Sequence, residues 1–212
     1  EMFEIEYKGG NAVVITTKKS KIVVDPKLSE LGLKDVPIKD AVEIATDQRF
    51  AVPAEEGRLA IDGPGEYEVG DFSIRGIPAR RHTDTENDVK KSTMYRIEVG
   101  GVRIALLGNI HFKLDDDQLE QLGVVDIVII PVGGGGYTLD VTNAATLVRA
   151  MDCKVVIPVH YADKGVKYEV PQEDLDVFIK EFGGTHETTS KYKVKAPSSV
   201  PLAPTIIEIT RS

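Results

Sequence analysis

Two short apolar runs with an amphipathic segment between them limit most strongly how this chain can fold. The runs are residues 127–130 and 155–157, and neither contains a polar side chain. Strands of this kind are usually covered on both faces of a sheet. Five apolar residues of the intervening segment recur at the spacing of one buried helical face: Val141, Ala144, Ala145, Val148 and Met151. With Asp140 as the expected N-cap, the pattern predicts a β-α-β unit.

The first half of the chain has the rhythm of short strands joined by turns. Gly70-Asp71 and Gly100-Gly101 stand where two-residue hairpin turns need positive φ. Strands are predicted over residues 3–7, 12–17, 21–24, 41–45, 57–61, 66–69, 72–77, 94–99 and 102–107. Further helices are expected over residues 116–122 and from Pro171 to the Gly183-Gly184 pair, and a last strand over residues 205–209.

Composition limits the partners of the chain. Its 212 residues suit a single domain spanning residues 1–212, and a net charge of -8 gives no general attraction to nucleic acid or to an anionic membrane. No apolar run approaches the roughly 20 residues that cross a bilayer, and the first residues do not have the order of a signal peptide. The single cysteine, Cys153, cannot form an internal disulfide. We therefore expect a cytoplasmic protein without nucleic-acid or membrane partners, and the oligomeric state stays open.

Three longer strings resemble a known family. They are residues 61–69 (IDGPGEYEV), 104–109 (IALLGN) and 155–161 (VVIPVHY), with support from residues 22–26 and 130–138. Together they resemble the metallo-β-lactamase fold family, and more narrowly its small bacterial Zn-dependent hydrolases, over nearly the whole chain. The resemblance implies a four-layer α/β/β/α sandwich with a two-metal site at one edge. It also implies a metal-activated hydroxide that attacks the substrate.

The first metal motif of that family departs from its pattern here. The family's Thr-His-x-His-x-Asp-His falls on residues 46–52, which read TDQRFAV. The two early histidines become Asp47 and Arg49, and the Asp-His pair becomes Ala51 and Val52. Asp47 can still offer an oxygen, but Arg49 carries a permanent positive charge and no acceptor. The motif as it stands disfavours a dinuclear centre.

The remaining ligand positions are only partly retained. The bridging aspartate of the family falls on Asn109, and the last histidine is kept as His160. The mid-chain histidine falls within residues 80–82, so either Arg81 or His82 takes its place. Tight zinc binding needs three or four ligands. A rebuilt mononuclear zinc site would draw on His160, His82, Asp47 and His111, and otherwise His160 is a buried histidine kept from an ancestral site.

A basic stretch and a glycine run supply further candidates. Residues 80–82 and the Lys90-Lys91 pair are positive in an acidic chain, which suits a carboxylate or phosphate ligand as well as an ordinary solvated loop. The run Gly133 to Gly136 lacks the Gly-Lys-Ser/Thr ending of a nucleotide loop, so we expect it to serve close approach of the backbone. The candidate ligand-binding residues are Arg49, Arg81, Asn109, Gly134, Gly135 and Tyr137.

Two functions remain open at this point. The first is a non-hydrolytic member of the fold that binds a small, anionic molecule in the old active-site cleft, with no catalytic residue and no cofactor. The second is a residual mononuclear hydrolase in which zinc on His160 and His82 activates water against an ester, amide or phosphoester. The sequence does not identify the ligand or substrate.

Overall fold

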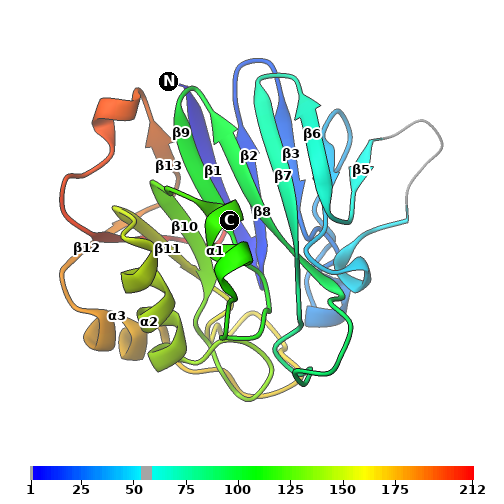
Figure 1. Ribbon diagram of the computed structural model, residues 1–212, viewed down its shortest axis with the longest axis vertical. Helices are drawn as coiled ribbons and strands as arrows, with labels where there is room; N and C mark the ends of the chain where they lie inside the picture. The colour runs from blue at the N-terminus through cyan, green and yellow to red at the C-terminus, as the bar shows by residue number, and fades with distance from the viewer. Residues whose placement is uncertain (1, 54–58) are drawn as a thin grey trace.

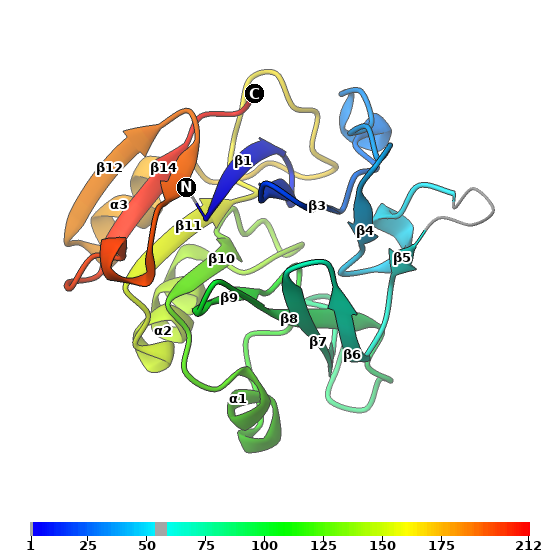
Figure 2. The same cartoon turned by 90° about the horizontal axis from the view of Figure 1, so that it is seen from above.

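The computed structural model describes residues 2–53 and 59–212. Two mixed β-sheets pack face to face, and the α-helices of the described residues lie on the outer side of the second sheet (Figure 1). Seen from above, α1, α2 and α3 all lie on that side (Figure 2). The α/β sandwich predicted from the sequence is confirmed.

The first sheet is built mainly from the N-terminal part of the chain. Its strands run in the order β13 (Tyr192–Val194), β1 (Phe3–Gly9), β2 (Ala12–Thr16), β3 (Lys21–Val24), β4 (Val42–Ile44) and β5 (Ala60–Ile61). The predicted strand 57–61 is described only from residue 59 onward, and residues 57 and 58 lie outside the described residues.

The second sheet contains the predicted β-α-β unit. Its order is β12 (Thr185–Thr189), β14 (Thr205–Ile209), β11 (Val155–Val159), β10 (Ile127–Pro131), β9 (Val102–Leu106), β8 (Ser92–Val99), β7 (Phe72–Ala79) and β6 (Gly65–Val69). β10 and β11 pair in parallel, with Ile127 opposite Val155, and α2 (Val141–Met151) connects them. Asp140 caps α2 by accepting the Asn143 N–H at 2.7 Å, as expected.

The main core fills the space between the sheets. Alternate residues of β1 point into it, namely Phe3, Ile5 and Tyr7, and they meet β-branched residues of the second sheet. The Tyr95 hydroxyl crosses this core and donates to the Ala45 carbonyl at 2.7 Å. This bond ties the end of β4 to the second sheet, next to the loops that form the candidate site.

Different outer layers cover the two sheets. A second core packs α2 and α3 (Leu175–Phe182) on one sheet, with α1 (Asp116–Leu122) beside β7. On the first sheet, Leu28 and Val36 from the loop around the 3-10 turn η1 (Ser29–Leu31) cover β2 and β3. This outer layer is therefore a loop with one turn of helix rather than an α-helix.

Two details differ from the sequence prediction. The helix expected from Pro171 begins at Leu175, because the preceding segment runs beside the glycine loop, where the Glu173 N–H donates to Gly133 O at 2.8 Å. β12 and β13 were not predicted, since their exposed polar residues lack the apolar alternation of a half-buried strand.

In the described part of the chain, no helix has the length and apolarity to span a bilayer.

Candidate functional site

Loops from both sheets meet at one edge of the sandwich and form the candidate site. The His160 N–H, at the end of β11, donates to the Gly10 carbonyl of the β1–β2 turn at 2.9 Å. Asn109, after β9, accepts from Asn11 Nδ2 at 2.9 Å and from the Thr138 hydroxyl at 2.7 Å. Four segments far apart in sequence are thus held together by polar contacts.

His160 is buried and neutral at this edge. It is 3% exposed, and its φ of +53° is unusual for a residue with a side chain. Burial lowers the pKa of His160 to about 4. Nδ1 lies 2.8 Å from Gln172 Oε1, which can only accept, so Nδ1 carries the hydrogen and Nε2 keeps its lone pair. The imidazole is therefore oriented and available as an acceptor.

Arg49 provides the positive charge of the site. Asp47 begins the turn η2 (Gln48–Phe50) by accepting the Arg49 N–H at 3.1 Å, and Arg49 Nε lies 3.2 Å from Asp47 Oδ2. The geometry of the second contact is that of an ion pair without a hydrogen bond. The guanidinium lies over the rings of Phe50, at 4.7 Å, and Tyr137, at 5.4 Å. The Asp47 carboxylate is thus neutralised by a side chain of its own turn.

Asp25 directly follows β3 (Lys21–Val24) in a buried position, and its φ is positive, +47°. Its carboxylate accepts from the Thr46 N–H at 2.8 Å and the Thr46 hydroxyl at 2.6 Å. Burial raises the pKa of Asp25 to about 7, against the opposing effect of these bonds. Asp25 therefore anchors the loop that follows β4.

Arg81 lines a groove together with Asp47, and His82 does not. Arg81 forms a two-pronged ion pair with Asp84, with Nη2 at 3.0 Å from Oδ1. His82 contacts the Ile110 carbonyl through Nδ1 at 3.2 Å, while His111 stacks on Phe112. Burial and the nearby Arg80 lower the pKa of His111.

The proposed metal donors are not gathered into one cluster. Neither His82 nor His111 lines the pocket beside His160. Within residues 2–53 and 59–212, no three His, Cys, Asp or Glu side chains are placed to hold a metal ion. The residues present at this edge do not fit a zinc centre of three or four ligands.

Two hollows open on either side of the η2 turn. One, the Arg81 groove, is lined by Asp47, Gln48, Asp62, Gly63, Pro64, Arg81, Lys90, Lys91 and Thr93. The other, the His160 pocket, is lined by Asn11, Asp25, Lys27, Leu28, Glu30, Leu31, Phe50, Tyr137, His160 and Glu169. The first is rich in cations and the second in acceptors.

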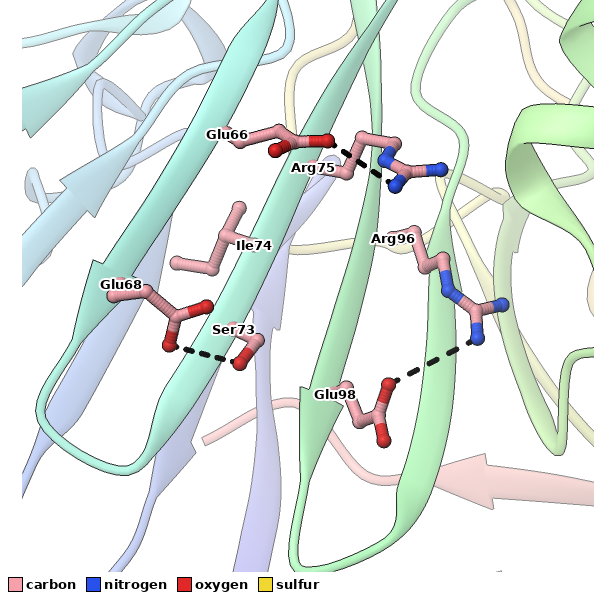
Figure 3. Close-up of a pocket in the computed structure, with 7 residues that line it drawn as sticks. All are labelled: Glu66, Glu68, Ser73, Ile74, Arg75, Arg96 and Glu98. Atoms are coloured by element: carbon pink, nitrogen blue, oxygen red, sulfur yellow. Dashed lines mark hydrogen bonds and ion pairs between the residues drawn. The ribbon is translucent and has the colours of Figure 1, made fainter.

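A third hollow lies on strands β6, β7 and β8 (Figure 3). Its charged side chains pair with one another, as Arg75 does with Glu66 at 3.2 Å and Arg96 with Glu98 at 3.9 Å. Arg96 also donates to the Leu122 and Val124 carbonyls at the end of α1. These contacts account for the charges without a ligand.

The glycine loop allows close approach of two segments. A Cβ on Gly133 would lie 2.2 Å from the His160 carbonyl oxygen, and one on Gly135 would lie 2.6 Å from the Pro171 carbonyl oxygen. The N–H groups of Gly134, Tyr137 and Thr138 bond within the loop. The expected packing role of the glycines is confirmed, and a ligand role for Gly134 and Gly135 stays a prediction.

Three residues of the site were not singled out from the sequence. Asn11 lies between two predicted strands, Asp25 follows a third, and Gln172 falls inside a predicted helix. Each contacts a residue distant in sequence: Asn109, Thr46 and His160, respectively. A single sequence carries no signal for these pairings.

Comparison with known proteins identifies the family of this chain. The beta-lactamase superfamily domain matches residues 4–160. A "UPF0173 metal-dependent hydrolase" of Thermococcus onnurineus is 30% identical over 46% of this chain, and the match covers 44% of that protein, less than half its length. A protein of the same name from Archaeoglobus fulgidus is 21% identical over 84% of this chain and 96% of its own.

Solved structures agree on the fold. A Thermotoga maritima protein grouped with the Zn-dependent hydrolases of the metallo-beta-lactamase superfamily superposes with a TM-score of 0.75, at 23% identity, covering 98% of each chain. Igni18, a metallo hydrolase of Ignicoccus hospitalis, has a TM-score of 0.62 at 16% identity, covering 99% of this chain and 95% of its own. The family domain matches more than half of this chain. The chain therefore belongs to the beta-lactamase superfamily and has the metallo-β-lactamase fold.

Proposed function

We propose that this protein binds a small anionic molecule in the old active-site cleft and does not hydrolyse it. The observation that carries the proposal is the position of Arg49. Its guanidinium stands in the first metal motif, paired with Asp47 and stacked on Phe50 and Tyr137. A fixed cation here repels a metal ion and keeps the positive charge that a metal would supply.

The state of the other motif residues supports the same proposal. Asn109 Oδ1 already accepts two hydrogen bonds, and the amide lacks the negative charge of a bridging ligand. Asp47 is neutralised by Arg49. His160 keeps an oriented lone pair on Nε2, and so does His82, whose Nδ1 contacts the Ile110 carbonyl, but His82 does not line the His160 pocket. One histidine in that pocket is fewer than the three or four ligands of a tightly held zinc ion.

The Arg81 groove is the proposed place of the anion. Arg81, Lys90 and Lys91 line it with Asp47 and Asp62, and two of these cations are already paired, Arg81 with Asp84 and Lys90 with Asp115. The guanidinium nitrogens of Arg49 other than Nε make no hydrogen bond to the described residues. Arg49 does not line the groove itself but is paired with Asp47, which does. A carboxylate or phosphate group bound between these cations would be held by charge-assisted hydrogen bonds.

Phosphate titration of paired variants tests the proposal. Calorimetry should show saturable phosphate binding that the double variant Arg49→Ala, Arg81→Ala abolishes. The control double variant Arg75→Ala, Lys154→Ala removes the same charge away from the groove and should bind as the wild type does. Equal binding by both double variants would overturn the anion site.

A residual mononuclear hydrolase is the second candidate, because one observation favours it. His160 donates from Nδ1 to Gln172, which is the arrangement that orients metal-ligating histidines. The names of the relatives point the same way. If this candidate is correct, His160→Ala removes both bound metal and any esterase activity, whereas the binding proposal expects neither to be present.

A further inference from the structure

The His160 pocket is separate from the Arg81 groove and has a different character. None of the residues that line it lines the groove. The Arg49 guanidinium lies outside the lining, over the Phe50 and Tyr137 rings. Three carboxylates line the pocket, Asp25, Glu30 and Glu169, against a single lining cation. That cation, Lys27, is paired with Glu30 at 3.3 Å. Asp25 and Glu169 are the lining carboxylates that no lining cation offsets, so the pocket disfavours an anion.

An unpartnered acceptor points to a ligand with hydrogens to donate. Asn11 is 7% exposed and lines the pocket, yet its Oδ1 has no hydrogen-bond partner among the described residues. A buried acceptor left unpaired is costly, so a donor is expected there. His160 Nε2 adds a second acceptor, since Nδ1 carries the hydrogen. Both residues that directly follow strands here, Asp25 and His160, also hold positive φ angles, which tend to persist at functional sites.

We propose that this pocket binds the primary ammonium group of a small amine. An ammonium group has three N–H donors and no acceptor, which suits a pocket whose polar groups are mostly acceptors. Asp25 and Glu169 supply the opposite charge, whereas the ring of Tyr137, which also lines the pocket, already carries the Arg49 guanidinium at 5.4 Å. Leu28 and Leu31 offer contacts to the alkyl part of the amine. The site goes beyond the proposed anion site, since it uses neither Arg49 nor Arg81.

Three probes of equal length test the charge and the donors. Calorimetry with n-butylammonium chloride, butan-1-ol and sodium butyrate, at constant ionic strength, should show saturable binding of the ammonium ion alone. Titration at pH 8 keeps Asp25 charged, because burial raises its pKa to about 7. Binding by butan-1-ol as strong as by butylammonium would overturn the proposal, and so would no ammonium binding up to about 10 mM.

Matched variants locate the binding. Glu169→Gln, at an exposed position, should weaken butylammonium binding by about two- to fivefold, while Glu181→Gln on α3 should leave it unchanged. Asn11→Ala, with a melting curve to confirm folding, should weaken it by about tenfold or more. The same affinity for Glu169→Gln and Glu181→Gln would overturn the assignment. Phosphate binding by the wild type is measured in a separate titration. The butylammonium results can therefore overturn the ammonium site without bearing on the proposed anion site.

Discussion

At the scale of single residues, Arg49 and His160 both lie next to the ring of Tyr137. The guanidinium carbon of Arg49 is 5.4 Å from the centre of the tyrosine ring, and the imidazole centre is 5.7 Å from it. The positive charge of Arg49 adds to burial in keeping the pKa of His160 low. A fixed cation and a neutral histidine thus contact the same tyrosine ring.

Removing the Arg49 guanidinium should destabilise the fold. Arg49→Ala loses the ion pair with Asp47 and two ring contacts, together worth about 1–2 kcal/mol of unfolding free energy. Arg49→Lys keeps the charge and should lose about half as much. Urea denaturation measures both. Arg75→Ala, which breaks a pair on the open sheet, is the control, and equal loss for the two alanine variants would contradict a special role for Arg49.

Asp25 and His160 should give opposite slopes of stability against pH. Burial raises the pKa of Asp25 to about 7, above its unfolded value, so its stabilising contribution, about 4 kcal/mol, is lost as pH rises from 4 to 7. Burial lowers the pKa of His160 to about 4, so its contribution, about 3 kcal/mol, is lost as pH falls from 6.5 to 4. In the wild type the two slopes largely cancel.

Single substitutions expose each slope. The stability of Asp25→Asn, relative to the wild type, should rise between pH 4 and pH 7, and that of His160→Gln should fall between pH 4 and pH 6.5. Urea midpoints across this range measure the differences. A difference that does not change with pH for either variant would show that the group titrates alike in the folded and unfolded chain.

At the scale of elements, the glycine loop after β10 holds the segment that carries Gln172. Gly135 and Gly136 both have positive φ, +71° and +75°, so alanine strains the backbone at either position. Only at Gly135 would the new Cβ also meet a backbone oxygen, that of Pro171, at 2.6 Å, while Gly136 faces open space. The two positions therefore separate backbone strain from close packing.

Gly135→Ala should be less stable than Gly136→Ala by about 1–3 kcal/mol, because the clash adds to the shared strain. It should also disturb the His160–Gln172 contact, visible as a shift of the His160 imidazole signals by NMR. Gly136→Ala is the matched control. Equal stabilities would mean that the loop moves freely away from residues 171–172.

The elements predicted from the sequence were those with strong local patterns. The β-α-β unit could be predicted from the apolar runs of β10 and β11 and from the apolar face of α2. The hairpin turn at Gly100-Gly101 could be predicted from the glycine pair, and both of its φ angles are positive. β12 carries exposed Thr, His and Glu, so its pairing with β14 depends on tertiary contacts. The Pro171 signal was wrong because the glycine loop holds that segment extended.

The candidate site could be predicted only where a family motif marks it. The residue types at Asp47, Arg49 and Asn109, which differ from the family motif, can be read directly from the sequence. The partners that decide their chemistry, such as Asn11 for Asn109, depend on loops brought together from different strands. Whether Arg81 or His82 takes the family's mid-chain position stays open, although Arg81 lines the groove with Asp47.

At the scale of the whole molecule, two sheets bring loops from distant parts of the sequence to one edge without a cluster of metal donors among the described residues. The fold is that of the metallo-β-lactamase family. The core between the sheets is apolar and continuous, so the sandwich has a source of stability that does not involve a metal ion. The proposed binding of an anion at this edge is a proposal about the site alone and does not alter the assignment of the fold.

The metal content of the purified protein tests this account most directly. The wild type and His160→Ala are dialysed against excess zinc and manganese, then against metal-free buffer, and measured by elemental analysis. We expect far less than one metal ion per chain in both proteins, with the same residual amount. About one tightly held ion per chain in the wild type, lost in His160→Ala, would contradict the account and establish a metal site at His160.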